Sequence, residues 1–124
     1  MKNSLIKLAC IALVSLVSMH VSAAPDEKTI GKAIFKKAMG TGCYGCHAAT
    51  SNPQIIELIK AGTLNKASFS KTVKDGKGGM PAMASTFMTI KVKDKATKEK
   101  KTIKDWGYSE AKAMDAIYNY LKSK

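Results

Sequence analysis

Cys43, Cys46 and His47 have the clearest chemical meaning in this sequence, because they form the motif Cys-x-x-Cys-His. This spacing is typical of covalent haem attachment, in which both cysteine sulfurs are bonded to the edge of the haem ring. The residue that follows then lies beneath the iron, where its imidazole can serve as the proximal ligand. We therefore predict that Cys43 and Cys46 attach one haem c and that His47 binds its iron.

Three other chemistries use closely spaced cysteines, and each fits the motif less well. A disulfide between Cys43 and Cys46 would close a very small, strained loop and would not need His47. A thioredoxin-like dithiol needs surrounding strands, which the sequence does not indicate. A structural zinc ion takes four ligands, and after residue 23 the sequence offers only these three of the Cys/His type. Haem attachment is the favoured interpretation, and the other three stay open.

A methionine is the expected second axial ligand, because the other histidine, His20, falls within a predicted signal peptide. Methionine is a common partner of histidine on haem iron, and it raises the reduction potential. The methionines that follow the signal peptide are Met39, Met80, Met83, Met88 and Met114. Met39 lies too near the attachment motif to reach the opposite face of the ring, and Met114 belongs to an apolar helical stripe.

Met80 is the favoured ligand because of the residues around it, Gly78-Gly79-Met80-Pro81-Ala82. The glycines allow the backbone to approach the ring closely, and the proline stiffens the chain directly after the ligand. Met83, three residues later, is the main rival. An iron with an open or different sixth position is the remaining possibility.

The first 23 residues predict a secretory signal peptide. Lys2 and Lys7 provide a positive start, residues 8–17 are an apolar run without charge, and Val21-Ser22-Ala23 is a small-residue cleavage pattern. The run is too short for a transmembrane helix, so we expect no stable membrane insertion. We predict cleavage after Ala23, a periplasmic location, and one domain over residues 24–124. An uncleaved N-terminal anchor is the alternative.

All 21 basic residues are lysines, and 19 of them remain after residue 23 against nine acidic residues, a formal net charge of +10. Without arginine the chain lacks the forked side chain that reads phosphates and bases. The charge alone would allow nucleic acid binding, but because we expect export we expect no nucleic acid partner. Lysine point charges suit the steering of an acidic partner protein. The candidates are Lys36, Lys37, Lys74, Lys77 and the lysines of residues 91–104. A solvated surface without a partner is the alternative for any one of them.

Apolar periodicity and capping residues predict about four helices. The first is capped by Asp26, repeats Ile30, Ile34 and Ala38 on one face, and ends at Gly40 and Gly42. Gly31 lies inside this helix at a cost of up to about 1 kcal/mol, which close approach of another helix would explain.

The other helices follow the same rules. The second is expected to begin with Asn52 as cap and Pro53 at its first position, and to end at Gly62. The third runs over 66–74, with Asn65 as its cap. The last follows Ser109, and its apolar stripe is Met114, Ile117, Tyr118 and Leu121.

Two long connections separate these helices. Residues 75–82 form a glycine-rich loop, and residues 89–104 carry seven lysines in a pattern that allows a short two-stranded hairpin. The fold class is therefore all-α, about four helices with a possible β-hairpin at 89–104. Long connections are reasonable in so small a domain if they wrap a cofactor.

Residues 28–121 resemble the class I c-type cytochromes, small soluble monohaem proteins. The landmarks stand in the family's order: Gly31-x-x-x-Phe35, Cys43-x-x-Cys46-His47, Gly79-Met80-Pro81-Ala82 and Ile117-x-x-Tyr120-Leu121. The resemblance implies the cytochrome c fold, with its helices around one covalently bound haem ligated by His47 and Met80. It also implies that the first and last helices cross, which explains Gly31. The chain departs from the family in its long lysine-rich segment and in the position of Trp106 after the methionine loop.

This resemblance and the motif together predict a periplasmic electron carrier rather than an enzyme. It would be a monomer that exchanges single electrons with acidic redox partner proteins, a dehydrogenase as donor or an oxidase as acceptor. One alternative is a haem-based peroxidase or gas-binding sensor, which would need an open iron. The other is a dedicated cytochrome subunit of a periplasmic dehydrogenase.

Overall fold

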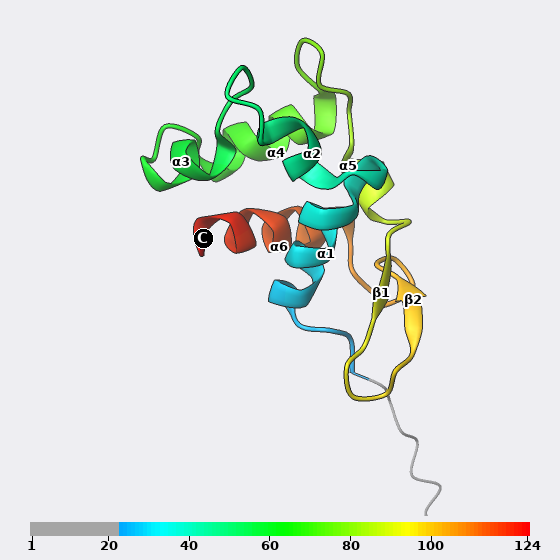
Figure 1. Ribbon diagram of the computed structural model, residues 1–124. Helices are drawn as coiled ribbons and strands as arrows, with labels where there is room; N and C mark the ends of the chain where they lie inside the picture. Colours follow the sequence, from blue (N-terminus) through cyan, green and yellow to red (C-terminus); the bar gives the residue numbers. More distant parts are fainter. Residues whose placement is uncertain (1–22) are drawn as a thin grey trace, which may run out of the picture.

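The computed structural model describes residues 23–124, so the predicted signal peptide lies outside the described residues except for Ala23. Over this range the chain is 52% helical with one two-stranded sheet (Figure 1). The elements are α1 Glu27–Lys37, the 3-10 turn Ala38–Gly40, α2 Gly42–His47, α3 Ile55–Lys60, α4 Lys66–Asp75, α5 Ala84–Phe87, β1 Lys91–Lys93, β2 Lys100–Thr102 and α6 Glu110–Lys122. A mostly helical chain with a short hairpin was predicted and is confirmed. None of the helices over 23–124 has the length and apolarity needed to cross a membrane.

The predicted caps begin three of the helices. The carboxylate of Asp26 accepts the N–H of Thr29 at 2.8 Å at the start of α1. The Asn65 side chain caps α4 and the Ser109 side chain caps α6 in the same way. Each cap satisfies a backbone donor that the first turn of a helix leaves free, so these three boundaries are encoded locally.

Helices α1 and α6 cross at the centre of the molecule (Figure 1). A Cβ atom on Gly31 would lie 2.6 Å from Cβ of Tyr120 and against the backbone of Ala116, so only glycine allows the two helices this close. The ring centroids of Phe35 and Tyr120 are 5.7 Å apart beside this contact. The predicted crossing, and the role of Gly31 in it, are confirmed.

The core spreads from this crossing. The largest fully buried side chains come from both central helices, from α5 and from the segment after β2; they are Phe87, Ile30, Ile34, Ile103, Ile117 and Leu121. No polar or charged residue is buried among the described residues. Hydrophobic burial is therefore the main stabilising term in this part of the chain.

The start of the second predicted helix was wrong. The helix α3 begins at Ile55 with Gln54 as its cap residue, not at Asn52 and Pro53. The Asn52 side chain donates to the carbonyl of Cys46, and the carbonyl of Pro53 lies against Nδ1 of His47. Both residues therefore stabilise the turn that follows α2 instead of starting α3. The two short helices α2 and α5 were not predicted either, because four to six residues show too little periodicity.

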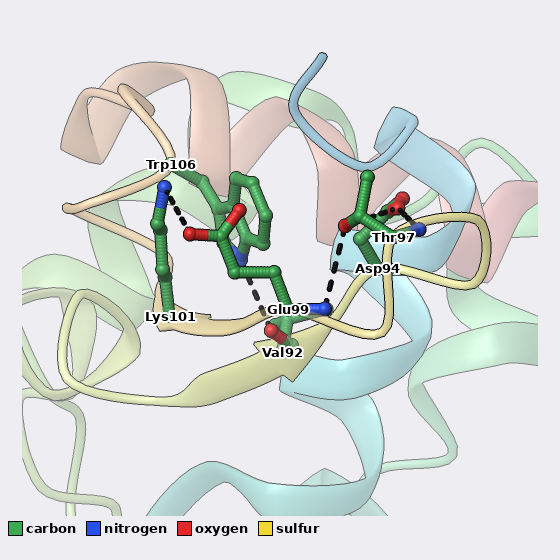
Figure 2. A network of polar contacts seen from close by, with 6 residues as sticks. All are labelled: Val92, Asp94, Thr97, Glu99, Lys101 and Trp106. Atoms are coloured by element: carbon green, nitrogen blue, oxygen red, sulfur yellow. Dashed lines mark hydrogen bonds and ion pairs between the residues drawn. The ribbon is translucent and has the colours of Figure 1, made fainter. Parts of the chain in front are cut away.

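Residues 91–102 form the predicted hairpin. Strands β1 and β2 are antiparallel, with Lys93 directly opposite Lys100. At the turn the carboxylate of Asp94 accepts the N–H of Thr97 at 2.7 Å. Trp106 is buried, and its Nε1–H donates to the carbonyl of Val92 at 3.0 Å, which fixes β1 to the segment that leads into α6 (Figure 2).

Candidate functional site

The predicted haem motif occupies helix α2, which follows α1 after a sharp reversal of the chain. Gly42 makes this reversal possible: its φ is +75°, and a Cβ atom there would lie 2.8 Å from Cα of Lys36. Any other residue would suffer both the left-handed backbone and this contact. The tight turn brings Cys43 directly against the face of the core that α1 helps to build.

The two cysteines lie one turn apart on α2 in different surroundings. Cys43 is buried in the hydrophobic core and Cys46 is exposed, and no disulfide joins them. Burial raises the pKa of the Cys43 thiol to about 11. A redox-active dithiol needs a thiol with a lowered pKa, so the environment of Cys43 disfavours the dithiol interpretation. A thioether sulfur does not ionise, and a buried position suits it.

The imidazole of His47 is fixed by one contact. Its Nδ1 atom lies 2.8 Å from the carbonyl oxygen of Pro53. Because a carbonyl can only accept, Nδ1 carries the proton, and in the neutral imidazole Nε2 then has the free lone pair. This is the tautomer that a metal-bound histidine needs, held by the kind of outer contact that such histidines make.

The turn between α2 and α3 places that carbonyl. The Asn52 side chain donates to the carbonyl of Cys46 at 2.7 Å, and the Gln54 side chain donates to the carbonyl of Ala49 at 2.9 Å. Both bonds close the turn around Pro53. The sequence analysis placed Asn52 and Pro53 at the start of the next helix instead, because the pair Asn-Pro is typical of a helix start.

Met80 lies in a tight turn of the glycine-rich loop. The N–H of Lys77 donates to the carbonyl of Met80 at 2.9 Å, and the N–H of Met80 donates back to Lys77 at 3.0 Å. The Met80 side chain is half-buried against the same hydrophobic core that contains Cys43. Met80 is therefore placed on a defined turn at the edge of the core rather than inside it.

The other methionines lie in three kinds of surroundings. Met83 is buried, and its N–H donates to the carbonyl of Val73 at 2.8 Å at the start of α5. Met114 is buried on α6, as its place in the apolar stripe predicted. Met88 is half-buried, whereas Met39 is 58% exposed.

These residues fit a covalently attached haem. Two sulfurs lie on successive turns of one short helix, the histidine beside them has a free Nε2, and a half-buried methionine packs against the same core. Within residues 23–124 no three His, Cys, Asp or Glu residues lie close enough together to hold a metal ion. A His/Met-ligated haem does not require such a group.

Most of the predicted steering lysines are free of ion pairs. The ion pairs of the described residues are Lys66–Asp115 at 2.7 Å, Lys71–Asp75 at 2.7 Å and Lys101–Glu99 at 2.8 Å. Among the candidates, only Lys101 is therefore neutralised. The other candidate lysines form none of these ion pairs.

Comparison with known proteins gave no relative: no family model, no curated protein and no solved structure matches the chain. The family that the motifs suggest therefore stays a prediction.

Proposed function

We propose that the chain is an exported c-type cytochrome of class I that carries single electrons. The contact between His47 and Pro53 is the observation that carries this proposal, because it prepares Nε2 of the histidine in the haem-attachment motif to bind iron. Neither a disulfide nor a dithiol gives a reason for this contact.

The roles of the residues follow from their positions. Cys43 and Cys46 would form the two thioethers, His47 would bind the iron through Nε2, and Met80 would bind it through sulfur. When bound, the haem supplies an iron that gains and loses one electron. His47 and Met80 would both stay bound in the two oxidation states, which would limit the reorganisation that opposes transfer.

The partner would be an acidic redox protein of the periplasm, and the carrier itself would be a monomer. Free lysines raise the rate of encounter with an acidic surface, in a manner that salt suppresses. Because His47 and Met80 would both hold the iron, no substrate would need to bind it, and the protein would not be an enzyme.

The test is an optical spectrum of the mature protein, produced with haem-attachment machinery, oxidised, then reduced, then exposed to carbon monoxide. We expect sharp low-spin reduced bands, the weak far-red ferric band of sulfur ligation, and no change with carbon monoxide. A high-spin spectrum that shifts with carbon monoxide would instead favour the peroxidase or gas-sensor alternative. Cys43→Ala combined with Cys46→Ala serves as the control, because it should release the haem on denaturation.

A further inference from the structure

The outer face of the hairpin carries three lysines without a counter-charge. Lys91 and Lys93 alternate with the buried Val92, so both lie on the exposed face of β1. Lys100 is directly opposite Lys93 on β2 and shares that face. Like charges directly opposite each other destabilise a sheet. None of the ion pairs in residues 23–124 involves these three lysines.

On the inner face of the same hairpin, the charged side chains are paired and held in place. Lys101 pairs with Glu99 at 2.8 Å, and its ammonium lies 4.8 Å from the ring centroid of Trp106. Figure 2 shows this arrangement together with the Trp106–Val92 hydrogen bond and the Asp94–Thr97 turn. Glu99 and Asp94 therefore bond to other groups and do not pair with the lysines of the outer face. The outer face of the hairpin carries positive charge only.

A recess of about 440 Å³ lies beside this face, where the end of α1 meets β1. Lys37, Lys91 and Lys100 line it, and no carboxylate does. The ammonium of Lys37 donates to the carbonyl of Lys91 at 2.9 Å, which joins the helix to the strand. Positive charge from two separate elements therefore converges on one open hollow.

Met39 also lines this recess and gives it an apolar part. Its side chain is 58% exposed, one of two large hydrophobic side chains so exposed among the described residues, and its φ is +52°. A non-glycine residue at positive φ is strained, and such residues are concentrated at functional sites. Protein-binding surfaces have an apolar centre surrounded by a polar rim. Met39 corresponds to such a centre, and the three lysines correspond to the rim.

We propose that the recess residues Lys37, Met39, Lys91 and Lys100, together with Lys93 on the adjoining outer face of the hairpin, dock an acidic surface of a partner protein. These five residues are here called the basic recess. Carboxylates of the partner would face the lysines, and an apolar side chain of the partner would cover Met39. The turn that holds Met39 leads directly into α2, so the partner would lie beside the helix that carries the haem-attachment motif. The identification of this partner as a redox protein rests on the proposed function; the docking itself does not.

A protein surface fits the recess better than a small anion does. The hydroxyl of Thr86 donates to the carbonyl of Met83 at 2.7 Å, and that of Thr89 donates to the carbonyl of Thr86 at 2.9 Å. Thr86 and Thr89 line the recess, but both hydroxyl protons are engaged, so neither hydroxyl can donate to a phosphate there. The exposed Met39 would gain nothing from a bare anion.

The experiment is a titration of the 15N-labelled mature protein with the peptide Glu-Glu-Glu-Leu-Glu-Glu-Glu at low salt, followed by amide chemical shifts. We expect the shifts to be confined to the turn after α1, to α5 and the residues that follow it, and to β1 and β2. The variant Lys91→Gln, Lys93→Gln, Lys100→Gln should weaken binding about tenfold, a sum of exposed charge pairs. Met39→Gln should weaken it about threefold.

The matched control is Lys60→Gln, Lys112→Gln, Lys122→Gln, which removes the same charge from exposed positions on α3 and α6. It should change the affinity less than twofold. Equal weakening by both triple variants would overturn the proposal, because general charge attraction would then explain binding. Inorganic phosphate that displaces the peptide at the same residues would overturn it in favour of a small-anion site. An unchanged affinity in Met39→Gln would show that Met39 is not part of the docking surface.

The same samples separate this proposal from the proposed function. A low-spin spectrum that carbon monoxide does not change, without peptide binding at the basic recess, would refute the docking surface and leave the electron carrier. Peptide binding at the basic recess by a protein that fails the spectroscopic test would refute the electron carrier and leave the docking surface.

Discussion

Nδ1 of His47 and the carbonyl oxygen of Pro53 are 2.8 Å apart, across a turn of only six residues. Because a backbone carbonyl accepts, it fixes both the orientation of the imidazole and the nitrogen that carries the proton. The residue type at position 53 matters less here than the path of the backbone. The contact therefore depends on whatever holds the turn between α2 and α3 in place.

Asn52→Asp tests that dependence. Asp has nearly the same shape as Asn but cannot donate to the carbonyl of Cys46, with which the Asn52 amide now bonds at 2.7 Å. We expect the free energy of unfolding to fall by about 1 kcal/mol, the usual loss for one hydrogen bond, when measured by denaturant titration. The reduction potential should also shift, because the histidine is less firmly held.

Asn119→Asp is the matched control, since Asn119 is exposed on α6 and far along the chain from the motif. It should leave the reduction potential unchanged. If both variants shift the potential by the same amount, the added negative charge is responsible, and the turn has no specific role.

The choice between Met80 and Met83 can be decided by a pair of variants. Met80→Ala should abolish the far-red ferric band and allow carbon monoxide to bind, because it removes the proposed sulfur ligand. Met83→Leu should keep the band and lose less than about 1.5 kcal/mol of stability, because leucine nearly conserves the volume of a buried methionine. Loss of the band in Met83→Leu, with its retention in Met80→Ala, would reverse the assignment.

Gly31→Ala tests the crossing of α1 and α6. A Cβ atom at this position would lie 2.6 Å from Cβ of Tyr120, so the helices must separate. We expect a loss of about 2 kcal/mol or more in the free energy of unfolding, within the range for overpacked cores. Lys32→Ala is the control, because Lys32 is exposed on the same helix. Its stability should be unchanged or slightly higher, since alanine is the best helix former.

Features that depend on neighbouring residues could be predicted from the sequence. Three helices begin at a side chain that accepts a hydrogen bond from the N–H three residues ahead, at Asp26, Asn65 and Ser109. The residue type at one position was therefore sufficient to predict each helix start. The chemistry of Cys43-x-x-Cys46-His47 is similarly local, and this is why a site could be predicted at all. The helix crossing at Gly31 is a contact between distant residues, yet it was predicted, because a glycine inside a periodic helix costs stability unless another helix approaches closely.

Contacts that no pattern in the sequence indicates could not be predicted. Gly42 begins α2 because the backbone of Lys36 lies against it, and no pattern in the sequence indicates that contact. Asn52 bonds to the motif helix rather than capping the next one. The basic recess joins the end of α1 to β1 and β2, which are separated by about fifty residues, so only the fold brings its lysines and Met39 together.

The cap at Asp26 predicts how stability changes in acid. The N–H and the hydroxyl of Thr29 donate to this carboxylate and hold its pKa below the ordinary value of 3.8. Because the folded state has the lower pKa, the charged cap stabilises the fold fully above pH 3.8. Its contribution is lost as the pH falls through the folded pKa.

Asp26→Asn isolates this contribution, because asparagine caps a helix well but does not titrate in this range. The free energy of unfolding of both proteins is measured by denaturant titration between pH 7 and pH 2, a range that includes the ordinary pKa of 3.8. In the difference between the two proteins, the contributions of the other carboxylates cancel. The unsubstituted chain should be the more stable near neutral pH, where its charge also favours the helix dipole, and should lose this advantage only below pH 3.8. A difference that stays constant through this range would mean that the Asp26 cap is not formed in solution.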